Sequence, residues 1–397
     1  MSEQASPRLR SSARRRDGRR RAAVTAAVAV AVGVMTAGVL APTAALASAR
    51  PDGVQQGLNV LVRDDGVPAV LASVTDRGGR ARNYTAGVAD PATGAKVPVD
   101  GQVRIGSNTK VFTAVVVLQL VGEGKIGLDT PVDTYLPGLV RGDGIDGRNI
   151  TVRQLLQHTS GLPEYLASPQ LSDITAAQHR YFEPRDLIDM ALAQKAEFAP
   201  GTKWAYNNTG YVLAGLIVQK VTGRPIGEEI TRRVIDRIGL RHTYFPAPGD
   251  QGIREPHPQG YYRTDAGAPL RDFTEMDPSW TWAAGQMIST DSDLNRFYGA
   301  LLGGDLLPEA QLAQMRTTVP TTELGPGISY GLGLASMPLP CGDGVYWGHS
   351  GGIPGYKTRA GATEGGRRAA SVAATVESSD AAVAKHLDSV MTTALCR

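Results

Sequence analysis

The sequence predicts an α/β (α+β) fold in which one antiparallel β-sheet, formed from both chain ends, is flanked by helices. Alternating strand patterns occur early in the chain and return after about residue 328, whereas the middle of the chain is mostly helical in pattern. Strands at both ends with helices between them favour one sheet and an inserted helical lobe. We expect a sheet lobe from residues 50–130 and 270–397 and a mostly helical lobe from residues 131–269.

The first 49 residues have the composition of an export signal. Residues 1–21 carry eight arginines and two acidic residues, and an uncharged run rich in Ala and Val follows. A basic region, an apolar region and an Ala-x-Ala exit predict a secretory signal peptide cleaved near residues 47–49. An uncleaved membrane anchor is the less favoured alternative, because alanine dominates the apolar run. We therefore expect a secreted domain at residues 50–397.

The basic net charge belongs to this leading segment. The whole chain carries +3 and residues 1–21 carry +6, so the remainder is close to −3. No run of Lys or Arg occurs after residue 50, so nucleic acid is not an expected partner. No His/Cys/Asp cluster has metal-ligand spacing and no Gly-rich phosphate loop precedes a helix. We therefore expect neither a metal nor a cofactor.

The secondary-structure elements follow from local patterns. A run from Val67 breaks at residues 76–79 and predicts a β-hairpin. An apolar helix is expected to begin near Ser107 and to end at residues 122–124. Further helices are expected within residues 151–161, 183–195, 207–223, 225–239, 289–304 and 379–395, and further strands within residues 329–336, 344–351, 356–363 and 367–378.

Two serines are candidate nucleophiles. The stretch GHSGG fits Gly-x-Ser-x-Gly, the pattern of a nucleophile elbow, with Ser350 at its centre. Asp380 and His386 could formally complete a triad, but Gly and Pro at residues 351–355 oppose the helix that an elbow requires. Ser107 and Lys110 instead lie three apart at a helix start, where they face the same way. A lysine shielded from water has its neutral form favoured and can take the hydroxyl proton.

Two further motifs accompany Ser-x-x-Lys. The stretch YNN, ending at Asn208, precedes a helix, and HSG, beginning at His349, lies on a later strand. In this order and spacing the three motifs resemble those of the penicillin-recognising serine hydrolases. The chain looks like the class C β-lactamase group, and within it is most similar to exported serine D-alanyl-D-alanine carboxypeptidases/transpeptidases. The likeness covers nearly all of residues 53–397, and implies a β-lactamase/transpeptidase-like fold.

The resemblance implies a role for each motif residue. Ser107 would be the nucleophile, with Lys110 or Tyr206 as the base for acylation. Tyr206 would pass a proton to the leaving amine, which calls for a phenol pKa lowered by Lys110. The N–H groups of Ser107 and Gly352 would form the oxyanion hole. The residues expected to bind substrate are Asn208, His349, Ser350, Gly351, Gly352 and Trp280.

The chain departs from its relatives in three places. Asn207 occupies the middle of Tyr-x-Asn, where they usually have Ser. The strand before His349 lacks the Arg with which some carboxypeptidases face the substrate carboxylate, and Gly352 replaces a frequent hydroxyl residue. Each change removes polar contact with a terminal carboxylate. Ordinary packing remains the alternative for Trp280 and for its neighbour Trp282, and we expect a structural role for His158.

Cys341 and Cys396 are the only cysteines. In an exported chain a lone pair most often forms a disulfide, with two buried thiols as the alternative. The disulfide would fasten the last helix to the strand before His349. It would stabilise the fold by roughly 4 kcal/mol on the chain-entropy estimate.

Together these features predict an exported serine D,D-carboxypeptidase/transpeptidase. It would act on the peptidoglycan stem peptide or a related D-amino-acid peptide, and β-lactams would acylate it. A class C-like β-lactamase, or an esterase or D-aminopeptidase on the same scaffold, is the alternative. A non-catalytic peptidoglycan binder is less favoured, because such a module needs no base beside its serine.

Overall fold

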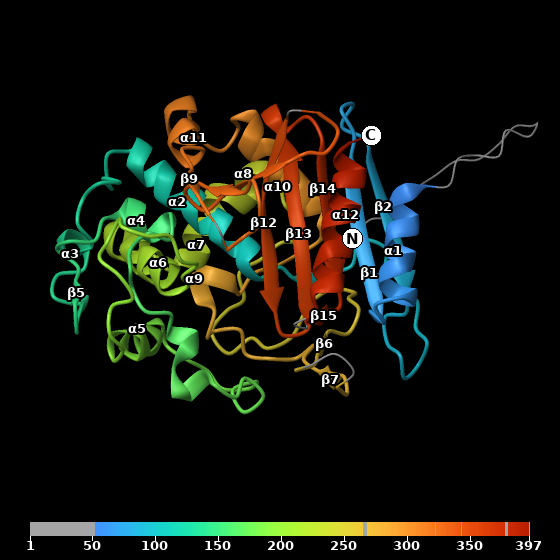
Figure 1. Cartoon of the computed structure of the whole chain (residues 1–397), viewed down its shortest axis with the longest axis horizontal. Helices are drawn as coiled ribbons and strands as arrows, with labels where there is room; N and C mark the ends of the chain where they lie inside the picture. Colours follow the sequence, from blue (N-terminus) through green and yellow to red (C-terminus); the bar gives the residue numbers. More distant parts are fainter. Residues whose placement is uncertain (1–51, 265–267, 322, 343, 378–379, 397) are drawn as a thin grey trace, which may run out of the picture. The chain divides into compact units, whose positions relative to one another are not determined.

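The computed structural model describes residues 52–264, 268–321, 323–342, 344–377 and 380–396. The predicted signal peptide at residues 1–49 lies outside these described residues. Residues 50–397 form one compact unit (Figure 1). Within the described part of the chain, no helix combines the length and apolar character needed to cross a bilayer.

One antiparallel sheet of eight strands organises this unit, in the order β2-β1-β14-β13-β12-β11-β10-β9. Its outer strand β2 comes from early in the chain, and β1 pairs with β14 from near the end, for example through Ser73 and Ser371. The predicted antiparallel sheet built from both chain ends is therefore confirmed. Its strands are β1 (Ala69–Thr75), β2 (Ala81–Gly87), β9 (Val319–Pro320), β10 (Ser329–Tyr330), β11 (Ala335–Pro338), β12 (Val345–Ile353), β13 (Tyr356–Thr363) and β14 (Ala369–Ala374).

Short strands form three smaller sheets outside the main sheet. The segment β15 runs parallel to β6, which pairs with β7, while β3 pairs with β8 and β4 with β5. Their bounds are β3 (Val103–Arg104), β4 (Arg141–Gly142), β5 (Ile145–Asp146), β6 (Tyr261–Tyr262), β7 (Arg271–Asp272), β8 (Ile288–Ser289) and β15 (Val376–Glu377).

Helices cover both faces of the sheet. The first and last helices, α1 and α12, pack against each other on one face, and α10 packs on the opposite face (Figure 1). The α-helices are α1 (Gly53–Arg63), α2 (Thr109–Gly122), α3 (Val132–Tyr135), α4 (Val152–Leu156), α5 (Pro184–Leu192), α6 (Thr209–Thr222), α7 (Ile226–Ile230), α8 (Asp236–Ile238), α9 (Trp282–Gly285), α10 (Asp291–Gly303), α11 (Glu309–Met315) and α12 (Ala381–Leu395).

Two hydrophobic clusters follow from this layering. The smaller cluster lies between the sheet and the pair α1 and α12, where Leu58 and Leu387 are fully buried. The larger cluster contains the centres of α2 and α6, including Val115 and Val212. Because α2 is apolar on almost every side, it is stable only as a buried central helix. A buried helix of this kind holds its first turn in a fixed position, which matters for the residues described below.

The chain enters α2 through one turn of 3-10 helix, η1 (Gly106–Asn108), packed directly against β12. Gly106 has φ of +50°, and a Cβ there would lie 2.9 Å from the backbone nitrogen of Gly352. Only glycine fits both the left-handed conformation and this contact. The sequence therefore brings Ser107 next to the end of β12.

The differences from the sequence-based expectation include α3, α9 and α11, which were not predicted, and the strand expected over residues 329–336, which is divided into β10 and β11. Two further differences concern α1 and the helix expected after residue 225. The helix α1 was not predicted, although Asp52 caps it by accepting a hydrogen bond from the N–H of Val54 at 3.0 Å. The single helix expected over residues 225–239 is divided by a π-helical segment at Thr231–Ile235. Glu229, at the end of α7 just before this segment, is buried and pairs with Arg232 and Arg233 within it.

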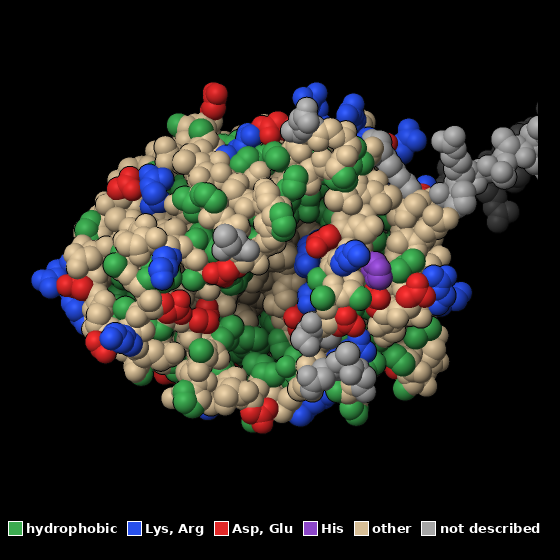
Figure 2. All heavy atoms as spheres, viewed as in Figure 1, with side chains coloured by type: hydrophobic (Ala, Val, Ile, Leu, Met, Phe, Trp, Pro, Cys, Tyr) green, Lys and Arg blue, Asp and Glu red, His purple; other side chains and the backbone are tan. Residues whose placement is uncertain are grey.

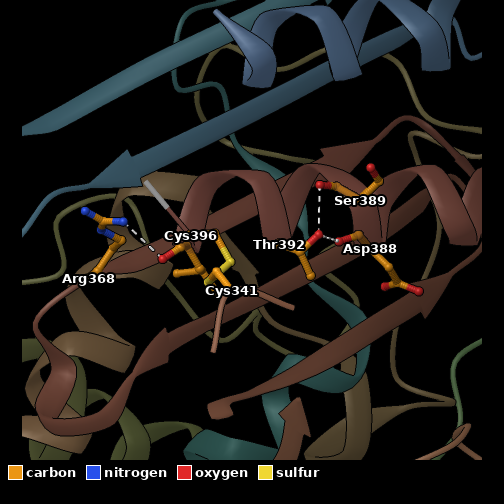
Figure 3. Close-up of a disulfide and its surroundings, with 7 residues drawn as sticks. Cys341, Arg368, Asp388, Ser389, Thr392 and Cys396 are labelled. Atoms are coloured by element: carbon orange, nitrogen blue, oxygen red, sulfur yellow. Dashed lines mark hydrogen bonds between the residues drawn. A yellow bond between two sulfur atoms is a disulfide. The ribbon is translucent and has the colours of Figure 1, made fainter. Parts of the chain in front are cut away.

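Cys341 and Cys396 form a disulfide with a Cα–Cα distance of 5.7 Å (Figure 3). Cys396 follows the last turn of α12, while Cys341 lies in the turn between β11 and β12. Arg368 donates a further hydrogen bond to the carbonyl of Leu395 at 3.1 Å. The disulfide therefore fixes the end of α12 against the turn that leads into the strand carrying His349.

Candidate active site

Ser107, Lys110 and Asn208 form one hydrogen-bonded cluster. The Nζ of Lys110 lies 2.9 Å from the Oγ of Ser107, 2.7 Å from the Oδ1 of Asn208 and 2.9 Å from the carbonyl oxygen of Ala284. These atoms come from η1 and the starts of α2 and α6, together with α9. Three segments distant in sequence thus fix a single amine beside one hydroxyl.

The surroundings of Lys110 favour its neutral form. Its side chain is completely buried, and this burial lowers its pKa to about 7, with the charge of Glu164 acting in the opposite direction. The Nζ lies 4.9 Å from the ring centroid of Tyr206. At neutral pH a substantial fraction of Lys110 is therefore available as a base.

Tyr206 lies beside Ser107, whose side chain acts to lower the pKa of the phenol. Burial raises the pKa of the Tyr206 phenol above its ordinary value, and the charge of Glu164 raises it further. The expectation that Lys110 lowers this pKa is therefore wrong, since desolvation outweighs any nearby positive charge. Tyr206 is a neutral phenol in this site, able to donate a proton but not to act as a resident phenolate.

Glu164 is a partly buried acid that lies outside the three motifs. Its Oε2 accepts hydrogen bonds from the backbone N–H of Asn208 at 2.6 Å and from the side-chain amide of Asn208 at 3.2 Å. Burial raises its pKa, while these hydrogen bonds and Lys110 oppose the shift. The stretch HTSGLPEY, in which Glu164 follows a turn, is the sequence feature that could have indicated this acid.

Asn207 explains one departure from the relatives' motif. Its Oδ1 accepts a hydrogen bond from the N–H of Gly210 at 2.8 Å, and its side-chain amide donates to the carbonyl of Leu162 at 2.8 Å. Its N–H in turn donates to the Nδ1 of His158 at 3.1 Å. Asn207 therefore caps α6, which leaves the side chain of Asn208 free to turn towards Lys110.

The strand β12 brings the third motif to the opposite side of Ser107. A Cβ on Gly351 would lie 2.1 Å from the carbonyl oxygen of Ile105, so β12 approaches this closely only with glycine there. His349 is 4% exposed, and its Nε2 lies 2.9 Å from the hydroxyl of Tyr330. Burial, followed by the charge of Lys110, lowers the pKa of His349 to about 3. His349 is therefore uncharged at neutral pH and can act in this wall only as a polar group.

A cavity of about 360 Å³ lies beside the third motif and is lined by Tyr206, His349 and Ser350, whereas Ser107 and Lys110 are not among its lining residues. The rings of Tyr206 and His349 have centroids 6.2 Å apart. Figure 2 shows that this face of the molecule is hollowed beside the lower part of β12 as drawn in Figure 1. Of the residues expected to bind substrate, Gly352 lies against Gly106, next to the nucleophile candidate.

The elbow interpretation of Ser350 is wrong. Ser350 lies inside β12, which continues to Ile353 and turns directly into β13 without an intervening helix. Its formal triad partners are engaged elsewhere: Asp380 caps α12, and His386 lies 2.7 Å from Asp65. Ser350 therefore forms part of the cavity wall.

Trp280 is not among the described residues that line this cavity. It is 5% exposed, and its carbonyl oxygen accepts a hydrogen bond from Tyr165 at 2.7 Å. A direct contact of Trp280 with substrate remains a prediction. His158 is buried with φ of +62°, a conformation held by its contact with Asn207.

A sequence model of the family described as Beta-lactamase matches residues 43–391. The chain belongs to the beta-lactamase family. It is a serine hydrolase of the superfamily that also contains penicillin-binding proteins and D-amino acid amidases. The finer likeness to the class C group stays a prediction.

Three relatives of this beta-lactamase family member illustrate its range. The structure of a D-stereospecific amidohydrolase from Streptomyces sp. is 39% identical, with a TM-score of 0.78 and coverage of 85% of this chain and 97% of that one. D-amino acid amidase from Ochrobactrum anthropi SV3, complexed with D-phenylalanine, is 28% identical with a TM-score of 0.73, covering 86% and 97%. Penicillin-binding protein 4* of Bacillus subtilis (strain 168) is 27% identical over 70% of this chain. That match spans only 61% of the relative's own length.

One charged pair at the cavity was not anticipated from the sequence. Arg359 on β13 lies directly opposite Ser350 on β12, and its Nε donates to the Oδ1 of Asp388 at 2.6 Å. Arg359 and Asp388 both line the cavity beside Ser350. Some carboxypeptidases have an arginine on the strand before the third motif, and this chain lacks it. Arg359 instead lies on the strand after that motif, and it is already paired with Asp388. The sequence does not show that Arg359 lies beside Ser350, because the two residues become neighbours only when β13 pairs with β12.

Within the described ranges, no group of three or more His, Cys, Asp or Glu side chains could hold a metal ion. The cluster around Lys110 brings together a hydroxyl, a buried amine and a side-chain amide.

Proposed function

We propose that the protein is an exported serine amidohydrolase that cleaves the amide bond following a D-amino acid, through an acyl-serine at Ser107. The observation that carries this proposal is the 2.9 Å contact between the Oγ of Ser107 and the Nζ of Lys110, an amine whose pKa is about 7. A nucleophile and a base in direct contact are what acyl transfer requires.

Lys110 would act as the base for acylation. In its neutral form it can donate hydrogen bonds to Asn208 and Ala284, and its lone pair then faces the hydroxyl of Ser107. As the Oγ attacks the substrate carbonyl, the hydroxyl proton passes to the Nζ and the carbonyl becomes an oxyanion. The N–H groups of Ser107 and Gly352 would bind that oxyanion, each such donor contributing about 10²–10³-fold in rate.

Tyr206 would complete the step as the proton donor. Its phenol keeps its proton because burial raises its pKa, and it lies beside the side chain of Ser107. It can protonate the departing amine while taking up the proton held by Lys110, so that the carbon–nitrogen bond breaks without a free amide anion. Water, activated by the same groups in reverse, would then release the acyl group.

The charge at the cavity supports a substrate whose leaving group is neutral. Arg359 is the basic residue facing Ser350, and Asp388 already holds it. A terminal carboxylate must displace this pair, whereas ammonia or a neutral amine leaves without doing so. The amidohydrolase and the D-amino acid amidase among the relatives support the same substrate class.

The D-alanyl-D-alanine carboxypeptidase predicted from the motifs is the second candidate. It is supported by the penicillin-binding relative and by the position of Arg359, which could bind a substrate carboxylate if it exchanged Asp388 for that group. Export is proposed from the leading basic and apolar segments, and the disulfide supports an oxidising location.

A substrate panel tests both candidates. Purified protein is assayed with D- and L-phenylalanine amide, an acylated lysyl-D-alanyl-D-alanine peptide, a chromogenic β-lactam and a simple aryl ester, with Ser107→Ala as control. We expect kcat/KM for the D-amide to exceed that for the L-amide and that for the D-Ala-D-Ala peptide by at least about tenfold. Faster turnover of the D-Ala-D-Ala peptide would establish the second candidate, and turnover of only the β-lactam or the ester would refute both.

A further inference from the structure

A second and larger cavity lies in the helical part of the molecule. Its volume is about 650 Å³, against about 360 Å³ for the cavity at Tyr206 and His349, and the two share no lining residue. Its walls are mainly apolar and aromatic, and include Leu216, Ile226, Phe245 and Trp282 together with several prolines. A volume of this size suits a small organic molecule.

The helix α9 separates this cavity from Lys110. The carbonyl oxygen of Ala284 accepts a hydrogen bond from Lys110, and that of Ala283 accepts one from Thr113 at 2.8 Å. Trp282 and Gln286, at the two ends of the same segment, line the cavity. Trp282 has φ of +34°, which is a strained conformation for a residue with a side chain.

Gln286 lines this cavity and carries a buried side-chain acceptor without a donor among the described residues. Its residue is 5% exposed, and its side-chain N–H group donates to the carbonyl of Pro246 at 2.9 Å. Its Oε1 is buried and accepts no hydrogen bond from any residue that the structure describes. A buried carbonyl oxygen without a donor is costly, and a ligand that brings an N–H group would remove that cost.

The charges around the cavity have one prevailing sign. Glu183, Glu228 and Asp277 line it, and the basic residue of its lining, Arg185, is held by Asp189 at 2.8 Å. Glu228 pairs with Arg224, while Asp277 is almost fully buried. Carboxylates next to aromatic faces favour organic cations over anions.

We propose that this cavity is a second binding site, separate from the Ser107 cleft, for a small aromatic amine. The aromatic ring would lie between Phe245 and Trp282, and the ammonium group would donate to the Oε1 of Gln286 and face the acidic side of the cavity. Nothing in this proposal depends on the reaction carried out at Ser107.

Phenethylamine serves as the probe, and its binding to the full protein is followed by ligand-observed NMR. We expect saturable binding with Kd on the order of 1 mM, as suits a ligand of this size. Ala247 is an exposed residue of the lining, so Ala247→Trp fills the cavity without burying a new side chain in the core. This variant should weaken binding at least about tenfold. Val99→Trp adds the same side chain at a site 71% exposed and outside the cavity, and should leave binding unchanged.

Two further comparisons test the chemistry. Gln286→Met removes the acceptor and should weaken binding about three- to tenfold. Phenethyl alcohol has the same shape without the charge and should bind at least about fivefold more weakly than the amine. Equal affinity of phenethylamine for the Ala247→Trp and Val99→Trp proteins would place the probe elsewhere and overturn the proposal. So would the absence of saturable binding, or equal binding of the alcohol.

Discussion

The two walls of the candidate cleft are built in different ways. The helical wall presents Ser107, Lys110 and Asn208 in a closed hydrogen-bond network, with Lys110 buried and its pKa displaced to about 7. The strand wall presents an edge of β12 where Ser350 is exposed. Its charged neighbours, Arg359 and Asp388, bind mainly each other.

This difference suits the helical wall to the chemical step and the strand wall to the choice of substrate. A base with a displaced pKa needs burial and fixed donors, which rigid helix starts provide. Substrate selection needs groups that can exchange a partner. The pair of Arg359 and Asp388 can do so because the side chain of its acid is 54% exposed. Changes to the helical wall should therefore alter the rate for every substrate, while changes to the strand wall should alter the ratio between substrates.

The largest effect is expected from Ser107→Ala. Without the hydroxyl no acyl-enzyme forms, so we expect hydrolysis to fall by about 10⁵–10⁶-fold. Intact-protein mass after exposure to penicillin should show no adduct. Ser350→Ala is the matched control on the other wall, and it should still acylate, although more slowly. An adduct that survives in Ser107→Ala would remove Ser107 as the nucleophile.

Lys110→Met should have the next largest effect. The wild-type acylation rate should rise with pH through about 7, because only the neutral amine accepts the Ser107 proton and burial holds its pKa there. The variant should lose about 10²–10⁴-fold in rate together with this part of the pH profile. If the acylation rate of Lys110→Met still rose with pH near 7, the base would be a group other than Lys110.

Glu164→Gln should have a smaller effect, which is to shift the pH dependence of acylation to lower pH. The negative charge of Glu164 raises the pKa of Lys110 against the effect of burial, so its removal lowers that pKa. The rise in acylation rate should then move to lower pH, and the variant should keep a larger share of its maximal rate at pH 6 than wild type does. Glu183→Gln, an exposed acid outside the network, is the control. An unmoved profile with a lower rate would leave Glu164 only a structural role.

The sequence predicted the sheet and the motif residues better than it predicted their electrostatics. Alternating patterns and caps identified β1, α2 and α10, and the spacing of Ser107 and Lys110 placed them on one side of a helix start. The lowered pKa of His349 and the raised pKa of Tyr206 depend on how far tertiary packing shields each side chain from water, which no local pattern records. Glu164 and Arg359 lie outside the motifs and reach the site only through tertiary packing and strand pairing.

The smallest effect, and the sharpest test of the strand wall, is expected from Asp388→Asn. Arg359 is largely buried and Asp388 more than half exposed, so neutralising the acid leaves a guanidinium next to Ser350 that can bind a substrate carboxylate. We expect kcat/KM for a D-Ala-D-Ala peptide to rise about three- to tenfold, with less than a twofold change for a D-amino acid amide. Ser389→Ala, one residue further along α12, is the matched control.

Arg359→Gln should act in the opposite direction, lowering turnover of the carboxylate-bearing peptide while the amide is little affected. If both variants changed the two substrates equally, the Arg359–Asp388 pair would merely support β13 against α12. In that case the strand wall would not select between substrates, and the proposed difference between the two walls would be wrong.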